Sequence, residues 1–318
     1  MDGAPSTAMA LGEQMNGQRL SRFRLMTYNI GGGRKDLGSQ PDDIAQVIEQ
    51  VSPDILALQE AASCQDADGV WHSLLSQVAK AGAFGNQAHF APALSMQEHM
   101  DVRKELFVHG LFNDWQDWRQ GNALLSRWEF VRLGDPSQPG TPRNVPLFRA
   151  PLYEGNRDTE PRYALLSRIR APHLTPFVVG VHLTTLVGER EREGGPRPSP
   201  DRVEAAQALR VQQARRLLAL LREHVLAPRE VVFLLGDFNG AASEPCISSV
   251  LVEEGGFKRL NTTNGQEATH AEAIESIDHI LVYPSDRLIE YRCWIVDTPL
   301  AREASDHLPV VAEVTIAA

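Results

Sequence analysis

The stretch VVFLLGDFNG, residues 231–240, constrains the fold more than any other part of the chain. Its first five residues are all apolar and β-branched or bulky, which predicts a short strand buried on both faces. Asp237 and Asn239 follow, and residues two apart on an extended backbone point to the same side. The sequence therefore predicts a carboxylate and an amide at a strand end, where α/β proteins build their sites. A plain turn is the alternative, because Gly-Asp-x-Asn-Gly is also favourable turn chemistry.

Other short apolar runs lie next to polar residues in the same way. Those polar residues are Asn29, Glu60, His182, Asp278, Asp306 and His307. Each has a structural interpretation of its own, such as an Asx turn, a solvated carboxylate, a core histidine or a cap. As a set they belong to one chemical family, and we expect them to meet at one edge of the fold.

The remaining pattern predicts a single α/β domain over residues 20–318, preceded by a disordered tail at 1–19. Helices are predicted near 41–50, 71–80 and 201–225, and a long loop is predicted at 134–160. Predicted strands far outnumber long helices, and many of them are short and buried. This pattern is typical of two β-sheets packed on each other with helices outside.

Composition and charge bear on the binding partner and on the cellular compartment. The formal net charge of −10 argues against broad electrostatic binding to long nucleic acid. The cysteines Cys64, Cys246 and Cys293 have no metal-ligand spacing, and this sparse, odd count is typical of a reducing compartment. We find neither an apolar leader segment nor a run long enough to cross a membrane, so we expect a cytoplasmic protein.

The polar residues at the strand ends favour one kind of chemistry. Oxygen ligands dominate and thiolates are absent, which suits Mg²⁺ or Mn²⁺ better than structural zinc. Histidines and carboxylates around such an ion suit attack of water on a phosphoryl group. The sequence has no nucleophilic serine elbow and no P-loop, so it indicates neither covalent serine catalysis nor ATP binding.

Four further residues are candidates for binding the substrate. Asn122 and Arg162 lie near the starts of two predicted strands, GNALLSRWEF and PRYALLSRIR. Arg162 is placed either to contact a phosphate or to remain solvated at a strand end. Trp115 and Trp118 are the best pocket candidates in an aromatic segment whose other members suit a satellite core. The charged segment after His182, LVGEREREGGPRPSP, is predicted to be a loop beside the site and a mobile cover.

Seven motifs occur here in the order seen in the endonuclease/exonuclease/phosphatase superfamily, whose members are the DNase-I-like enzymes. They are TYN, LQE, GNALLSR, the histidine of VVGVHL, GDFN, IDHILV and SDHLPV. The resemblance covers about residues 22–315. It implies a four-layer α/β sandwich of two mixed β-sheets flanked by helices, with the site at one edge of the sheets.

The resemblance also implies individual roles. Glu60 resembles a metal ligand, and Asn29 and Asp306 resemble further ligands, either direct or through water. Asp237 resembles the group that positions or deprotonates the attacking water, with Asn239 beside it.

The two histidines have counterparts in the same family. His307 resembles a phosphate-contacting histidine oriented by Asp278. His182 resembles a second phosphate contact and an acid near the leaving oxygen.

The departures from known subfamilies bear on the substrate. Arg119 is nearest to the place where apurinic endonucleases carry a tyrosine, and the extended signatures of deadenylases and inositol phosphatases are missing. The motifs GNALLSR and HLTT look most like bacterial members of the superfamily.

The sequence therefore predicts a Mg²⁺- or Mn²⁺-dependent phosphoesterase acting on a phosphodiester, either nucleic-acid ends or a small molecule. Hydrolysis of lipid or sugar phosphate head groups is one alternative, and a non-catalytic binding module on the same fold is another.

Overall fold

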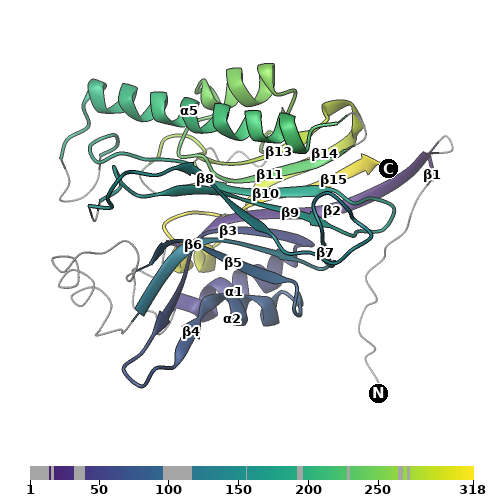
Figure 1. Cartoon of the computed structure of the whole chain (residues 1–318), viewed down its shortest axis with the longest axis horizontal. Helices are drawn as coiled ribbons and strands as arrows, with labels where there is room; N and C mark the ends of the chain where they lie inside the picture. The colour runs from purple at the N-terminus through teal and green to yellow at the C-terminus, as the bar shows by residue number, and fades with distance from the viewer. Residues whose placement is uncertain are drawn as a thin grey trace.

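The computed structural model describes residues 14–15, 18–31, 40–95, 117–154, 156–191, 196–227, 230–263, 268–270 and 273–318. Two β-sheets pack face to face, with helices on both outer surfaces (Figure 1). This four-layer arrangement confirms the predicted fold class.

Within the described residues, the first sheet has eight strands and the second has seven. The path through the first sheet is β14 (Leu288–Ile295), β15 (Val310–Ala317), β2 (Gln18–Asn29), β3 (Ile55–Gln65), β6 (Asp117–Ser126) and β5 (Ala88–Ser95), with β1 (Gln14–Met15) on β2 and β4 (Trp71–Ser73) on β3. The path through the second is β12 (Lys258–Arg259), β13 (Asp278–Tyr283), β11 (Val232–Asp237), β10 (Phe177–His182), β9 (Arg162–Ile169) and β7 (Phe130–Val131), with β8 (Arg143–Phe148) on β9.

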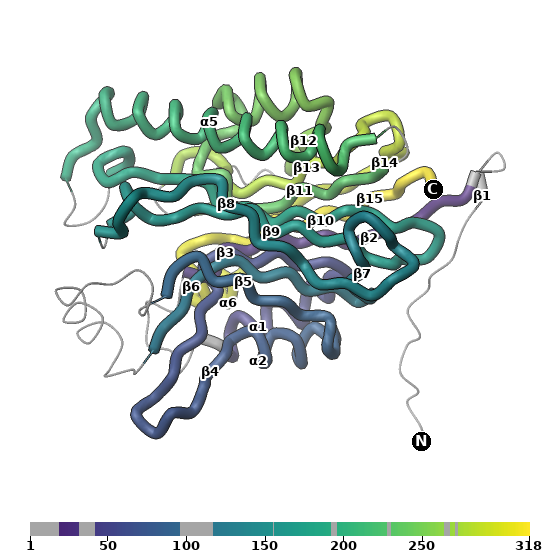
Figure 2. The backbone as a smooth tube through the Cα atoms, in the orientation of Figure 1, coloured from purple at the N-terminus to yellow at the C-terminus, as the bar shows by residue number. Residues whose placement is uncertain are grey.

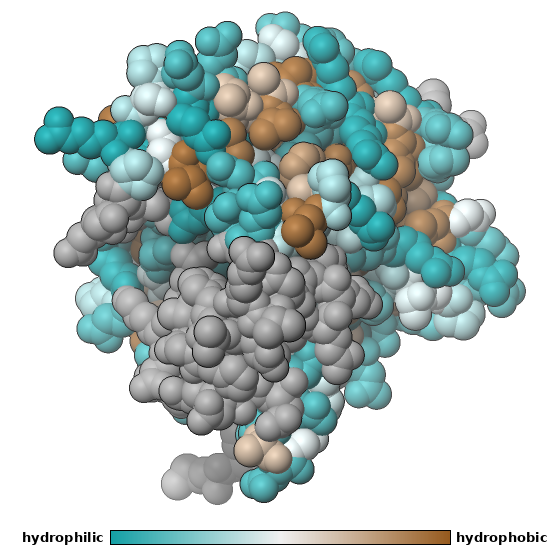
Figure 3. Space-filling view, turned by 60° about the vertical axis from the view of Figure 1, so that its left-hand side comes forward, coloured by the Kyte–Doolittle hydropathy of each residue, from teal (hydrophilic) through white to brown (hydrophobic). Residues whose placement is uncertain are grey.

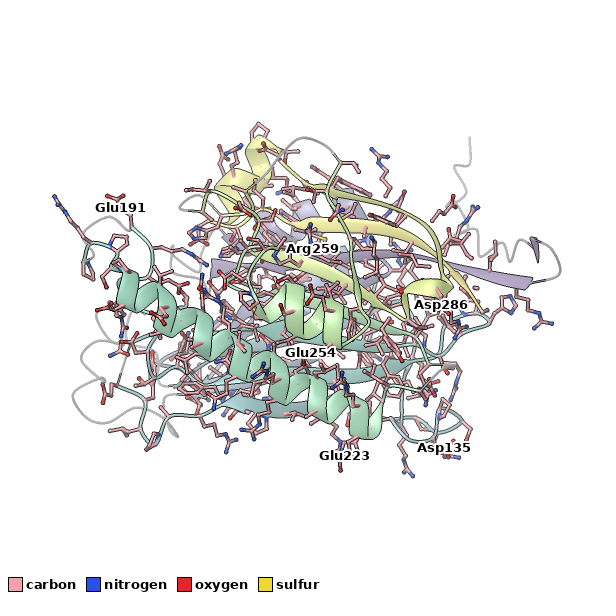
Figure 4. All side chains as sticks on the ribbon, turned by 90° about the horizontal axis from the view of Figure 1, so that it is seen from above. Asp135, Glu191, Glu223, Glu254, Arg259 and Asp286 are labelled. Atoms are coloured by element: carbon pink, nitrogen blue, oxygen red, sulfur yellow. The ribbon has the colours of Figure 1, made fainter. Side chains whose placement is uncertain are left out.

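Helices cover the outer face of each sheet. α1 (Gln40–Val51) and α2 (Leu74–Ala81) lie on the eight-stranded sheet, and α6 (Pro299–Ala304) contacts α1. α5 (Pro200–His224) and the π-helical segment η2 (Cys246–Glu254) lie side by side over the other sheet (Figure 4). A short 3₁₀ turn, η3 (Ser285–Arg287), links β13 to β14. α5 begins at Pro200, next to the predicted start at residue 201, and Ser199 caps it by accepting a hydrogen bond from the Arg202 backbone N–H.

Strand register brings the polar ends together. β2 and β3 are parallel, with Asn29 opposite Gln59, and β10 and β11 are parallel, with His182 opposite Asp237. The antiparallel β13 starts at the same edge, where Asp278 is opposite Asp237. The turn before β15 lies at this edge too, because Val310 at the start of β15 pairs with Thr27 near the end of β2 (Figure 2). Ala317 at the end of β15 pairs with Leu20 near the start of β2.

The two sheets share one apolar core. Phe23 of β2 and Phe233 of β11 meet edge to face, with ring centroids 5.1 Å apart. Gly180 of β10 allows a close approach, because a Cβ there would lie 3.3 Å from the Leu124 side chain and 3.7 Å from that of Ala57. Tight packing at this interface fixes one sheet relative to the other.

Some elements differ from the sequence prediction. The predicted loop at 134–160 contains β8, and the predicted helix at 71–80 begins only after β4. The strand β14, the segment η2 and the helix α6 were not predicted. At the N-terminus, β1 pairs with Gln18 and Arg19, inside the segment assigned to a tail.

In the described part of the chain, no helix has both the length and the apolar composition needed to cross a bilayer. The described surface in Figure 3 is largely hydrophilic, with hydrophobic residues in small patches.

Candidate functional site

Asp237 is the centre of the candidate site. Its side chain is buried, and its Oδ2 accepts a hydrogen bond of 2.9 Å from Asn29 Nδ2. The same oxygen lies 3.5 Å from His182 Nε2 and 3.8 Å from His307 Nε2. Side chains from both sheets therefore converge on one carboxylate.

The local backbone around Asp237 explains the GDFN motif. A Cβ on Gly236 would lie 2.1 Å from the Val181 carbonyl oxygen, so only glycine allows β10 and β11 to pair this closely. Asn239 adopts a positive φ of 50°, which asparagine tolerates, and its N–H donates to Asp237 Oδ1 at 2.7 Å. The motif therefore forms the predicted turn, and the same turn places Asp237 and Asn239 side by side at the end of β11.

Glu60 is held in an unusual backbone conformation. Its φ is 54°, and the pairing of β3 with β6 is irregular between Leu58 and Ala61. Its Oε1 lies 3.4 Å from Asn29 Nδ2, and its Oε2 accepts from Gln120 Nε2 at 3.0 Å. A non-glycine residue with positive φ beside a bulge is a kind of strain that clusters at functional sites.

His307 and Asp278 form a buried pair. His307 Nδ1 lies 2.9 Å from Asp278 Oδ2, which leaves Nε2 directed toward Asp237. Burial opposes protonation of the ring, but the nearby carboxylates of Asp278, Asp237 and Asp306 outweigh it and raise the pKa of His307 to about 9. The imidazole is therefore a cation at neutral pH.

His182 has the opposite character. Arg162 Nη1 lies 3.0 Å from Nδ1 and 3.2 Å from Nε2 of this ring, and Arg162 also makes a bidentate pair with Glu160. Burial and then the Arg162 charge lower the pKa of His182 to about 3. A neutral His182 can donate a hydrogen bond, but it holds no proton to give as an acid at neutral pH.

Asp306 is the exposed member of the set. Its side chain is 45% exposed, and its backbone turn is fixed to β2 through Ser305, whose Oγ donates to the Asn29 carbonyl at 2.8 Å. Ser305 Oγ also accepts from the His307 backbone N–H at 3.2 Å. The SDH turn thus acts as a structural anchor as well as a source of site residues.

The residues around Asn29 fit a hard divalent cation. Carboxylate oxygens of Glu60 and Asp237 approach the same amide nitrogen of Asn29 from two strands in different sheets. Two carboxylates that share one hydrogen-bond donor repel each other unless positive charge lies nearby. The carboxylate oxygens at this edge are donors that Mg²⁺ and Mn²⁺ prefer. Asn29 faces them with its amide nitrogen, while its Oδ1 accepts from the Gly31 backbone N–H at 3.1 Å, so this amide holds the carboxylates in place.

Two of the four predicted substrate-binding residues line a pocket in the structure. Asn122 and Arg162 line a small pocket together with Glu60, Gln120 and His182. Asn122 Nδ2 donates to the Tyr163 carbonyl at 3.0 Å, so its side chain also joins two strands.

The two tryptophans behave differently from the pocket residues. Trp118 is buried in β6 and is not part of the lining of this pocket. Trp115 lies outside the described residues.

The loop after His182 is firmly attached where the structure describes it. Arg210 of α5 is fully buried and pairs with Glu189 at 2.6 Å and Glu244 at 2.9 Å. Next to Glu189, Arg190 Nη1 donates to Asn239 Oδ1 at 3.1 Å, and Nη2 donates to the Asn239 carbonyl. The loop thereby places a cation directly beside the site, and Glu191 follows near the start of α5 (Figure 4).

Several site neighbours were not identified from the sequence. They are Gln120, Glu160, Arg190 and His270. Glu160 lies two residues before Arg162, so charge alternation near a strand end was an available clue. For the other three residues the local sequence contains no comparable pattern.

The chain matches the sequence pattern of the Endonuclease/Exonuclease/phosphatase family over residues 26–307, a span that contains every described site residue. The chain belongs to this family. No curated protein matches this endonuclease/exonuclease/phosphatase family member by sequence at a significant level.

Solved structures of this fold resemble this family member at low sequence identity. The human Nocturnin catalytic domain with bound sulfate anion has a TM-score of 0.62 at 18% identity, covering 92% of this chain and 94% of its own. An endonuclease/exonuclease/phosphatase from Beutenbergia cavernae has a TM-score of 0.60 at 22% identity, covering 93% and 72%. Truncated Caenorhabditis elegans TDP2 has a TM-score of 0.56 at 16% identity, covering 92% and 97%.

Proposed function

We propose that the protein is a Mg²⁺- or Mn²⁺-dependent phosphoesterase that hydrolyses a phosphodiester by in-line attack of water. The observation that carries this proposal is the buried Asp237 carboxylate, which lies within 3.8 Å of two imidazoles and accepts a hydrogen bond from Asn29. A carboxylate beside two histidine nitrogens can orient water while the imidazoles meet phosphate oxygens.

In this proposal Glu60 and Asp306 would hold the cation, with Asn29 positioning Glu60 and Asp237 through its Nδ2. A bound cation would supply positive charge opposite the phosphate oxygens. Asp237 orients the attacking water and accepts its proton. The Asn239 amide, fixed by Arg190 and by a 3.0 Å hydrogen bond to the Leu183 carbonyl, borders the same space.

The two histidines then have different tasks. Cationic His307, oriented by Asp278, stabilises negative charge on a phosphate oxygen through Nε2. Neutral His182 donates a hydrogen bond to a second oxygen, and the adjacent Arg162 adds positive charge without a proton transfer. The sulfate anion bound by the human Nocturnin catalytic domain supports an oxyanion as ligand, because sulfate resembles phosphate in shape and charge.

The substrate class follows from charge and size. The net charge of −10 disfavours many phosphate contacts along a polyanion, so nucleic-acid ends or small phosphodiesters rank before long duplexes. Lipid and sugar phosphates rank next. The described cysteines are all free and buried, which supports the cytoplasmic location proposed for this enzyme.

The proposal is tested with bis-p-nitrophenyl phosphate and a panel of single-stranded DNA, duplex DNA, RNA, phospholipid and inositol phosphate. Each is assayed with Mg²⁺, with Mn²⁺ and with EDTA, across a salt titration. We expect metal-dependent release on at least one diester, with a shallow salt dependence. An absence of metal-dependent hydrolysis on every ester would instead favour the non-catalytic binding module.

Glu60→Gln should weaken the affinity of the protein for Mg²⁺ without destabilising the fold. Loss of one carboxylate charge should raise the Mg²⁺ concentration for half-maximal activity roughly 10- to 100-fold. The measurement is a Mg²⁺ titration of initial rates after EDTA treatment. Glu154→Gln, outside the site, is the matched control, and an unchanged Mg²⁺ titration in Glu60→Gln would remove Glu60 from the ligand set.

Asp278→Asn should lower kcat/KM about 10²-fold, because an amide supports the cationic His307 ring less well than a carboxylate. Steady-state kinetics on the best diester measure this change. Asp286→Asn, on the surface turn η3, is the control for the same chemical substitution. Activity within twofold of wild type would show that His307 does not need this partner.

A further inference from the structure

His270 has no role in the proposed reaction, yet it lies against the SDH turn. The Leu308 backbone N–H donates to the Thr269 carbonyl at 2.7 Å, and His270 and His307 form an isolated antiparallel bridge. The His270 side chain is only 3% exposed. The segment before β13 therefore delivers a second buried imidazole to this turn.

The nitrogen and oxygen atoms of this group are close together. His270 Nε2 lies 3.5 Å from Asp306 Oδ2, and the His270 and His307 rings meet edge to face with centroids 4.5 Å apart. One ligand atom from each of the three residues lies within 4.8 Å of the other two. Two ligands on a tetrahedral zinc ion stand roughly 3.3–3.5 Å apart, so the His270–Asp306 spacing suits such an ion.

We propose that His270, Asp306 and His307 form a binding site for a borderline transition-metal cation, Zn²⁺ or Co²⁺. Two imidazoles and one carboxylate form a ligand set that suits Zn²⁺ and Co²⁺ better than Mg²⁺, because Mg²⁺ favours oxygen ligands. The position is distinct from that of the Glu60 carboxylate. Asp306 is common to both sets of donors and is exposed to solvent, which provides an entry path.

The orientation of His307 supports the assignment. Metal-bound histidines usually donate the other ring N–H to a carboxylate, which fixes the tautomer. The 2.9 Å contact between His307 Nδ1 and Asp278 Oδ2 supplies this partner. Nε2 becomes the ligand atom when the arriving cation displaces its proton to solvent. The ring is thus held in position before any cation arrives.

Occupation of this site would have a consequence for catalysis, which rests on the proposed function. His307 Nε2 cannot bind a metal and contact a substrate phosphate at the same time. Zn²⁺ at this site should therefore inhibit Mg²⁺-supported hydrolysis, because it removes the cationic imidazole and withdraws Asp306 from the other cation.

Binding is measured first, without any substrate. The full chain is treated with chelator, and Zn²⁺ binding is followed by calorimetry and Co²⁺ binding by visible absorption. We expect one site, weakened at least about 100-fold in His270→Phe and in Asp306→Asn, the second of which alters an exposed side chain rather than the core. Thermal melting followed by circular dichroism checks that both variants are folded.

Two control variants test whether Zn²⁺ binds at this site rather than elsewhere on the protein. Glu60→Gln should retain Zn²⁺ affinity, and so should His72→Phe, which removes an exposed histidine paired with Asp66 at 2.7 Å. Unchanged Zn²⁺ binding in folded His270→Phe would overturn the proposal. Equal weakening by Glu60→Gln would also overturn it, because the cation would then occupy the oxygen-donor position.

Activity gives an independent readout. Zn²⁺ should inhibit Mg²⁺-supported hydrolysis in the wild type, and His270→Phe should raise the inhibitory concentration by a similar factor of about 100. Zn²⁺ that binds without inhibiting would overturn the assignment of His307 as a ligand. The calorimetric result holds even if no substrate is found, so failure of this site and failure of the proposed function are distinguishable.

Discussion

Replacing Asp237 with asparagine should lower kcat/KM about 10³- to 10⁴-fold while leaving the protein folded. The amide retains the shape of the carboxylate and an oxygen that can accept from Asn29, so the hydrogen bond in the buried site is preserved. It cannot accept a proton from water, and general-base catalysis of this kind typically contributes 10²–10⁴-fold. Loss of the charge between His182 and His307 adds to the effect.

Steady-state kinetics on the best diester, with Mg²⁺ at saturation, measure the effect of Asp237→Asn. Asp135→Asn is the matched control, because Asp135 lies in an exposed turn, where it accepts from Ser137 Oγ at 2.6 Å. Thermal melting checks the fold of both variants. Turnover within tenfold of wild type in Asp237→Asn would contradict the central role of this carboxylate.

Replacing Arg210 with methionine should destabilise the protein by about 3–5 kcal/mol. Arg210 is fully buried, with its guanidinium between the carboxylates of Glu189 and Glu244. Burial lowers the pKa of Arg210, but these two carboxylates outweigh it and keep the pKa above its usual value. Methionine fills similar volume but leaves the buried carboxylate of Glu189 and the partly buried carboxylate of Glu244 without their cation, which is the costly outcome for a buried ion group.

Urea unfolding of the wild type and Arg210→Met gives this free energy of unfolding. Arg215→Met is the control on the same helix, since Arg215 is 65% exposed and lies 3.9 Å from Glu254. The triple variant Arg210→Met, Glu189→Gln, Glu244→Gln should recover part of the loss, because it removes the unpaired charges. A loss for Arg210→Met no larger than that of Arg215→Met would show that the buried cluster contributes no stability.

The same cluster shows how far the sequence could predict this protein. The apolar runs and the polar residues beside them predicted the two sheets and the edge where Asn29, Asp237 and His182 meet. This worked because strand register converts a local pattern into a spatial one. Arg210 could not be interpreted in this way, because a charged residue on the buried face of a helix makes sense only with its partners, and Glu244 lies 34 residues away.

Glu60 and His270 show two other limits. The sequence predicted Glu60 at a strand end, but its positive φ and the bulge around it depend on pairing with β6, which is distant in the chain. His270 lies in no helix or strand and next to no apolar run, so only the tertiary fold brings it to Asp306. Edge strands such as β14 were missed for a related reason, since its side chains include exposed polar residues that weaken the apolar pattern.

Because the candidate site is divided between two sheets, the packing of the sheets in the core sets the distances between its side chains. Asn29 and Glu60 belong to one layer, whereas Asp237, His182 and Asp278 belong to the other. A lateral shift of one sheet against the other would separate Asn29 and Glu60 from Asp237 and His182 while leaving each sheet intact. A side chain at Gly180 would press against Leu124 across the two sheets, so this buried glycine bears on how the two halves of the candidate site are aligned.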